Sequence, residues 1–226
     1  EPIQEDTNQE ASLEYPQETT LDTGKPILLI VEDNEEIQKY IAESFANSFE
    51  VLTAYNGEEG KQQALSRIPD IVVSDIMMPV MDGMTLCKEI KSKFETSHIP
   101  ILLLTAKTSE TDRTQAYEIG ADSYLTKPFN LTVLHARIHN LLRARERKNQ
   151  DFKKQIVFEA KELNYTSIDE EFLQKAIDCV HQHLDEPEYD LAHFLQDMGT
   201  SRSTLFRKMK SLTGLSYVSF IRNVRL

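Results

Sequence analysis

The sequence of 226 residues has little cysteine and no tryptophan. Its two cysteines, Cys87 and Cys179, lie far apart, and neither has a second cysteine at the C-x-x-C spacing that zinc and thiol-redox sites use. This shortage argues against a disulfide framework and against the common zinc motifs. We expect both thiols to be small buried side chains in a reducing compartment.

Long apolar runs are also missing from the chain. No stretch approaches the roughly 18 apolar residues that a membrane-spanning helix needs, and residues 1–26 have neither the basic region nor the apolar segment of a signal peptide. We therefore expect a cytoplasmic protein with no membrane partner. The missing initiator methionine and the end at Val224-Arg225-Leu226 lead us to expect a piece of a longer protein.

Each end of the chain lacks charges of one sign. Residues 1–24 contain seven acidic residues and no basic residue, which predicts a flexible acidic linker. Residues 200–226 contain six basic residues and no acidic residue. The formal net charge of −12 argues against nucleic acid as a partner of the whole chain, but the basic end suits phosphate groups.

Between residues 25 and 147, short apolar runs alternate with segments of helical periodicity. The predicted strands are residues 27–31, 50–55, 70–75, 99–106 and 122–126. The predicted helices are residues 35–46, 58–68, 84–94, 109–120 and 130–147. Because three of the strands are nearly all apolar, we expect both faces of a parallel sheet to be covered. The predicted fold class is therefore α/β, with a doubly wound sheet of five parallel strands.

Charged and polar residues stand at the ends of these strands. Glu32 and Asp33 follow the first strand, and Asp75 ends the third. Thr105 lies at the end of the fourth strand, and Lys127 follows the fifth. Because the carboxyl ends of parallel strands form one ligand-binding edge, we expect these side chains to meet in a crevice. Three carboxylates repel one another unless a cation lies among them, and such oxygen ligands suit Mg²⁺.

These residues belong to four of five short motifs. The five motifs are Glu32-Asp33-Asn34, Asp75-Ile76-Met77-Met78-Pro79, Met81-Asp82-Gly83, Thr105-Ala106 and Gly120-Ala121-Asp122-x-Tyr124-x-x-Lys127-Pro128-Phe129. With these motifs in this order, residues 26–147 resemble the receiver domain of two-component response regulators, which has a flavodoxin-like fold.

The resemblance implies a metal site and a phosphorylation site. Asp75 would be the phosphoacceptor, because an aspartate can attack phosphorus and form an acyl phosphate. Glu32, Asp33, Asp75 and the backbone carbonyl of Met77 would bind Mg²⁺. The plainer interpretation of Glu32 and Asp33 is a pair of charges at a helix N-terminus.

The resemblance also implies three residues that respond to the phosphoryl group. Lys127 would pair with the phosphoryl oxygens, Thr105 would move to hydrogen-bond them, and Tyr124 would change its rotamer when Thr105 moves. An ordinary core residue is the alternative for Tyr124. Lys127-Pro128 is the position at which this family usually has a cis peptide bond.

The residue two positions after Asp75 bears on enzyme activity. Mg²⁺-dependent phosphohydrolases with an aspartate nucleophile have the pattern D-x-D there, and the second acid transfers a proton. Met77 occupies that position and cannot transfer a proton. We therefore predict that the chain is not an enzyme and that Asp75 loses phosphate to water only slowly. No G-x-G-x-x-G follows the first strand, which excludes a dinucleotide site.

The remainder of the chain has helical periodicity only. The predicted helices are residues 169–184, 190–198, 201–214 and 216–226. The turn at Gly199 predicts a helix-turn-helix, with Ser201 as the N-cap of its second helix. We expect three residues of that helix to face inward: Leu205, Met209 and Leu212. We expect four to face outward toward DNA: Arg202, Ser203, Arg207 and Lys208. The alternative is a helical hairpin with a solvated basic face.

Residues 201–226 resemble the first helix-turn-helix and the connecting helix of AraC-type transcription regulators. Residues 169–199 resemble the segment that precedes this unit in hybrid two-component proteins, which join a sensor, a histidine kinase, a receiver and an AraC-type domain in one chain. The second helix-turn-helix unit of the family lies beyond this sequence. We therefore expect DNA binding by this chain to be weak or absent, since each lost phosphate contact lowers affinity.

These patterns predict four parts. They are an acidic linker at 1–24, a receiver at 25–147, a connector at 148–168 that continues or interrupts the last helix of the receiver, and a truncated AraC-type DNA-binding domain at 169–226. The predicted function is a response regulator: a histidine kinase, expected in the same parent chain, phosphorylates Asp75 with Mg²⁺ and thereby controls transcription. The alternative is a receiver that acts only through protein contacts, such as formation of a homodimer or feedback on the kinase.

Overall fold

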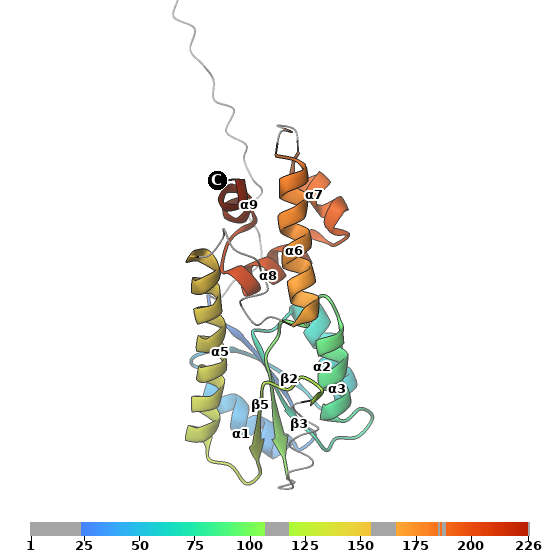
Figure 1. The fold of residues 1–226 in the computed structure, drawn as a ribbon. Helices are drawn as coiled ribbons and strands as arrows, with labels where there is room; N and C mark the ends of the chain where they lie inside the picture. Colours follow the sequence, from blue (N-terminus) through green and yellow to red (C-terminus); the bar gives the residue numbers. More distant parts are fainter. Residues whose placement is uncertain (1–23, 107–117, 155–165, 185, 187–188, 226) are drawn as a thin grey trace, which may run out of the picture.

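The computed structural model describes residues 24–106, 118–154, 166–184, 186 and 189–225, and for residues 151–154 it describes the backbone alone. Nearly all of the predicted acidic linker and most of the predicted helix at 109–120 lie outside these residues. In the described ranges the chain forms an α/β part followed by a helical part, here called the receiver half and the helical half (Figure 1).

The receiver half is built on one sheet of five parallel strands. The strands are β1 (Ile27–Val31), β2 (Glu50–Ala54), β3 (Ile71–Asp75), β4 (Ile101–Thr105) and β5 (Ser123–Thr126). They lie in the order β2-β1-β3-β4-β5, and every neighbouring pair is parallel. This arrangement confirms the predicted doubly wound fold and makes β1 and β3 neighbours at the centre of the sheet.

Helices cover both faces of this sheet. They are α1 (Glu35–Phe45), α2 (Gly57–Arg67), α3 (Gly83–Ser92) and α5 (Leu131–Lys154). Asn34, Asn56 and Asp82 cap the first three helices, because each side chain accepts a hydrogen bond from a backbone N–H in the first turn. These caps fix where the chain leaves each strand end and turns into a helix.

The alternation of side chains along β1 divides the core into two layers. Leu28 and Ile30 pack with residues of α1 and α5, whereas Leu29 and Val31 pack with residues of α2 and α3. Successive residues of a strand point to opposite faces, so an apolar run becomes buried on both sides. Cys87 and Cys179 are free and buried, as predicted.

Helix α5 continues into the predicted connector, which is one of the two alternatives for that segment. It runs to Lys154, and helix α6 begins at Ser167, also inside the segment that we predicted as a connector. Residues 148–154 contain neither glycine nor proline, so their polarity does not interrupt the helix. The first part of the connector is therefore helical.

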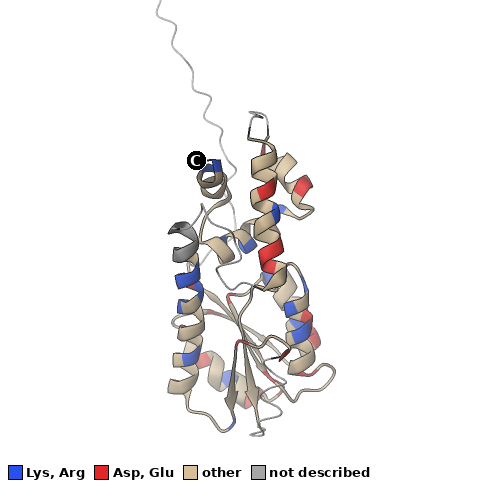
Figure 2. Ribbon diagram, viewed as in Figure 1, with Lys and Arg blue, Asp and Glu red and all other residues tan. Residues whose placement is uncertain are grey.

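The helical half has its own apolar core. Its helices are α6 (Ser167–Gln182), α7 (Leu191–Met198), α8 (Arg202–Thr213) and α9 (Tyr217–Arg225). Phe172, Phe194, Leu205, Met209 and Phe220 are buried together in this core. Basic residues lie along α5 and on α9, while acidic residues gather on α6 and α7 (Figure 2). No helix in the described ranges is both long enough and apolar enough to cross a membrane.

Candidate functional site

Three carboxylates meet at the carboxyl ends of β1 and β3. Oxygen atoms of Glu32, Asp33 and Asp75 all lie within 4.8 Å of one another. Glu32 and Asp75 are buried, with exposed fractions of 1% and 7%, whereas Asp33 is exposed. The predicted crevice therefore exists, and it is open to solvent on the side of Asp33.

Lys127 reaches into this crevice from the segment after β5. Its Nζ atom lies 2.7 Å from Oε2 of Glu32 and 2.9 Å from Oδ2 of Asp75. The backbone N–H of Lys127 donates a 2.6 Å hydrogen bond to the carbonyl of Thr105 at the end of β4. The peptide bond between Lys127 and Pro128 is cis, as the resemblance implied.

The crevice holds more negative than positive charge. With all four groups ionised, three carboxylates face one ammonium group. Burial raises the pKa of Glu32, the hydrogen bond from Lys127 opposes that shift, and the charge of Asp75 adds to it. For Lys127, burial acts to lower the pKa, but the hydrogen bonds and charges of Glu32 and Asp75 outweigh burial and raise it. A further cation would relieve the repulsion among the carboxylates.

The donor set of the crevice fits a hard divalent cation such as Mg²⁺. All of its ligand atoms are carboxylate oxygens, and one of the three residues is exposed to water. Mg²⁺ usually takes one or two protein carboxylates and keeps several waters, which requires an open site of this kind. Glu32, Asp33 and Asp75 are the residues that could hold it.

Backbone contacts hold Asp75 in position. The backbone N–H of Ile76 donates a 2.7 Å hydrogen bond to Oδ1 of Asp75, and the N–H of Gly83 donates to the carbonyl of Ile76 at 2.9 Å. A Cβ atom on Gly83 would lie 2.0 Å from the carbonyl oxygen of Asp75, so only glycine fits there. The start of α3 is thus packed directly against the strand end that carries Asp75.

The remaining predicted site residues differ in how far they are buried. Thr105 is buried at the end of β4, next to the strand that carries Asp75. Tyr124 lies on β5, half-buried against the core layer beneath α2 and α3. Met77 is 61% exposed in the loop after β3. The structure therefore brings Glu32, Asp75 and Lys127 into contact and leaves Met77 at the surface.

The sequence did not lead us to Gln38, a residue of α1 whose side chain holds the backbone at Glu32 in position. This buried side chain donates hydrogen bonds from Nε2 to the carbonyls of Glu32 (3.0 Å) and Ala54 (2.9 Å). Gln38 precedes the buried Ile41 by three residues and Phe45 by seven, so it lies on the apolar face of α1. A polar residue at such a position was a signal for a buried hydrogen bond.

One of the four residues that we predicted to face outward on α8 does not. Ser201 caps α8, and Leu205, Met209 and Leu212 are buried, as predicted. Arg202, Ser203 and Arg207 are exposed. Lys208, however, is fully buried and faces the core.

The helical period explains this error. Position 208 follows Leu205 by three residues and precedes Leu212 by four, so it lies on the inward face of α8. A lysine there was assigned to the surface by its residue type alone.

Comparisons with known proteins agree with this geometry. Residues 28–139 match the family described as "Response regulator receiver domain". The chain is 36% identical over 202 residues to "Histidine kinase P4" of Formosa agariphila, covering 89% of the chain and 15% of that protein. It is 30% identical over 171 residues to "Response regulator ArlR" of Staphylococcus aureus, covering 75% of the chain and 72% of that protein.

Solved structures give the same result. The chemotaxis response regulator CheY4 of Vibrio cholerae matches with a TM-score of 0.50 and 30% identity, over 52% of this chain and 98% of that one. The chain therefore belongs to the response-regulator receiver family, and its receiver half functions in two-component signalling that depends on phosphorylation. The AraC-type resemblance of the helical half stays a prediction.

Proposed function

We propose that this chain is a phosphoryl-accepting regulator in which Asp75 receives a phosphoryl group from a histidine kinase. The observation that carries the proposal is the contact between Oδ2 of Asp75 and Nζ of Lys127, 2.9 Å apart, inside a crevice of three carboxylates. The kinase belongs to the same parent chain, which the likeness to a histidine kinase over 202 residues supports. The protein works in the cytoplasm.

The transfer follows from the positions of these groups. A carboxylate oxygen of Asp75 attacks the phosphorus of a phosphohistidine, the new O–P bond forms as the N–P bond breaks, and the imidazole leaves with the electron pair. Lys127 exchanges its contact with Asp75 for one with the phosphoryl oxygens and neutralises their charge. Glu32, Asp33, Asp75 and the backbone carbonyl of Met77 would hold Mg²⁺, which would supply further charge neutralisation.

Thr105 and Tyr124 then change position in response to the phosphoryl group, and this changes the protein surface. The carbonyl of Thr105 already accepts a hydrogen bond from Lys127, and Thr105 lies on the strand beside Asp75. A hydroxyl that moves toward the phosphoryl group leaves space into which the neighbouring Tyr124 turns. The surface formed by β5 and α5 changes with it and pairs with a second copy of the receiver.

The chain stores phosphate and does not turn over substrate. Met77 stands where an aspartate phosphohydrolase has its second acid, and its side chain is 61% exposed. Water therefore has no general base at this position, and the acyl phosphate is lost slowly.

The output of the switch is DNA binding by the helical half. Helices α7 and α8 are joined at Gly199, which has a left-handed conformation with φ of 66°. Exposed Arg202, Ser203 and Arg207 on α8 suit contacts with bases and phosphates. Because the described part of the chain contains one such unit, the affinity of this chain for DNA is low.

A receiver that acts only through protein contacts is the second candidate function. The burial of Lys208 favours it, because α8 then serves partly as a packing element. Deletion of residues 166–226 separates the two functions: an unchanged effect of phosphorylation on dimerisation would favour the second candidate.

The phosphoacceptor is tested by intact-protein mass after incubation with Mg²⁺ and a small phosphodonor. We expect one phosphoryl group on the chain and none on Asp75→Asn. Asp82→Asn is the matched control, because it makes the same charge change nearby and asparagine still caps α3. Full phosphate uptake by Asp75→Asn would overturn the proposal.

A further inference from the structure

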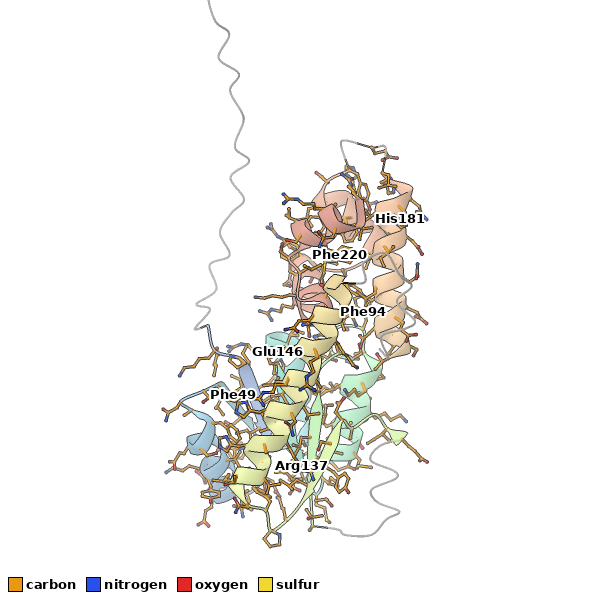
Figure 3. All side chains as sticks on the ribbon, turned by 60° about the vertical axis from the view of Figure 1, so that its left-hand side comes forward. Phe49, Phe94, Arg137, Glu146, His181 and Phe220 are labelled. Atoms are coloured by element: carbon orange, nitrogen blue, oxygen red, sulfur yellow. The ribbon has the colours of Figure 1, made fainter. Side chains whose placement is uncertain are left out.

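A second buried ionic cluster lies between the receiver half and the helical half. The Nζ atom of Lys208 on α8 is 2.8 Å from Oδ1 of Asp169 on α6 and 2.8 Å from Oγ of Ser97, and it also donates to the carbonyl of Phe94. Phe94 lies where the two halves meet (Figure 3). We call these four residues, Phe94, Ser97, Asp169 and Lys208, the Lys208 cluster.

The Lys208 cluster satisfies its charged groups completely. An ammonium group has three donors, and Lys208 has an acceptor for each. The carboxylate of Asp169 accepts additional hydrogen bonds from Ser97 and from Thr166, both at 2.7 Å. The ring of Phe94 lies 4.5 Å from the ammonium nitrogen. A lysine with no exposed surface requires such a set of partners.

Two of the partners of Lys208 belong to the receiver half. Phe94 and Ser97 lie in the segment between α3 and β4. The preceding residue of α8, Arg207, donates from Nη1 to the carbonyls of Arg67 (3.1 Å) and Ser66 (3.5 Å) at the end of α2. Two of the four residues that we expected to contact DNA are therefore bound to the receiver half.

This attachment lies at the opposite edge of the sheet from the acidic crevice. The end of α2 precedes β3 and the Ser97 segment precedes β4, so both are at the amino ends of strands. Helix α5 also packs against α8 (Figure 1). The crevice is therefore accessible to a kinase while the helical half is docked.

A polar cavity lies beside the Lys208 cluster. A cavity of about 270 Å³ is lined by residues of α5, α8 and the segment before β4. His98 Nδ1, Asn149 Oδ1 and Ser211 Oγ line it and have no hydrogen-bond partner in the described part of the chain. The volume of the cavity and these polar atoms together suit bound water between the two halves.

We propose that the receiver half holds helix α8 through the Lys208 cluster and the Arg207 contacts, and that this docking and DNA binding exclude each other. Arg207 cannot donate to the carbonyls of α2 and to a DNA phosphate at once. Because Arg207 shares the exposed face of α8 with Arg202 and Ser203, it must leave the receiver half before a duplex can lie along that face. The second half of this proposal rests on the proposed DNA-binding function, whereas the docking itself does not.

Hydrogen exchange of the 226-residue chain tests the docking. Ser97→Lys places a second ammonium group beside Lys208, so we expect the peptides at 94–98 and 202–213 to exchange about tenfold faster or more. Ser97→Ala removes one hydroxyl and should act in the same direction with a smaller effect. Ser92→Lys, an equal charge change at the exposed end of α3, is the control and should leave both peptides unchanged.

Phosphate uptake at Asp75 shows that the receiver half of each variant is folded. If the Ser97 variants take up phosphate and both peptides exchange as in the wild type, the docking proposal is overturned. Faster exchange at 94–98 alone, with 202–213 unchanged, would also contradict it.

Anisotropy of a short fluorescent DNA duplex of random sequence, at low ionic strength, tests the exclusion. We expect Ser97→Lys to bind the duplex several-fold more tightly than Ser92→Lys, which carries the same net charge. Equal affinity together with faster exchange would overturn the exclusion and leave the docking in place. If no variant binds the duplex, the DNA-binding output fails, while the assignment of Asp75 is unaffected.

Discussion

The acidic crevice and the Lys208 cluster each pair a lysine with buried carboxylate, but they differ in charge balance and exposure. Lys127 faces Glu32, Asp33 and Asp75 in a crevice that is open at Asp33. Lys208 faces one carboxylate in a closed site and has a partner for every donor. The open site, with its excess of negative charge, can bind a cation and accept a phosphoryl group. The closed and balanced site can only hold elements together.

The largest expected effect comes from removing the positive charge of the Lys208 cluster. Lys208→Met leaves Asp169 buried without its cation, so we expect the free energy of unfolding of the helical half to fall by about 3–5 kcal/mol. Urea unfolding followed by circular dichroism measures this loss. Adding Asp169→Asn to Lys208→Met should recover much of it, because no unpaired charge remains. Lys210→Met, on the exposed face of α8, should change stability by less than about 0.5 kcal/mol.

A cation bound in the acidic crevice should instead stabilise the receiver half. Mg²⁺ at a hundred times its dissociation constant stabilises a protein by about 2.7 kcal/mol when it binds the folded state alone. We expect the thermal midpoint of the receiver half to rise with Mg²⁺ in the wild type and in Glu36→Gln, an exposed control on α1. The rise should be much smaller in Asp33→Asn. An equal rise in all three proteins would mean that the ion binds elsewhere.

A smaller effect concerns the pH dependence of stability that results from the buried His98 at the interface. Burial, with the charge of Lys208 as the next cause, lowers the pKa of His98 from 6.5 to about 3. Between these values the unfolded chain binds a proton at His98 that the folded chain excludes, so stability falls as pH decreases below 6.5. The loss is at most about 1.4 kcal/mol per pH unit. Urea unfolding between pH 6.5 and pH 5 should show a shallower decline for His98→Asn, and parallel declines would contradict this assignment.

The smallest effect concerns backbone strain beside the crevice. Val80 has φ of 68° and is 84% exposed in the loop between β3 and α3, an unfavourable conformation for a β-branched residue. We expect Val80→Gly to raise the free energy of unfolding by up to about 1 kcal/mol, since released strain exceeds the entropic cost of glycine. Val80→Ala keeps a Cβ atom and should gain less. A loss of stability in Val80→Gly would show that the valine side chain makes a necessary contact.

The crevice could be predicted from the sequence because its residues stand directly at strand ends. Apolar runs located β1 and β3, and parallel pairing then required Glu32 and Asp75 to be close. The cis bond between Lys127 and Pro128 followed from a local motif. Local sequence and global fold specify the same arrangement here.

The Lys208 cluster could not be predicted in the same way. Its members come from α8, α6 and the segment before β4, and no spacing along the chain relates them. The inward position of Lys208 could have been recognised from its distance to Leu205 and Leu212, but its partners could not. The end of α5 stayed open for a related reason, because a polar helix that packs on α8 has the composition of a linker.

The central claim is that Asp75, and no other acid, accepts the phosphoryl group. An acyl phosphate is reduced by borohydride to the corresponding alcohol, so a phosphorylated aspartate becomes homoserine. After incubation with Mg²⁺ and a small phosphodonor, followed by borohydride and peptide mass analysis, we predict homoserine at position 75. Homoserine at position 33, or phosphate uptake without homoserine at position 75, would contradict the account.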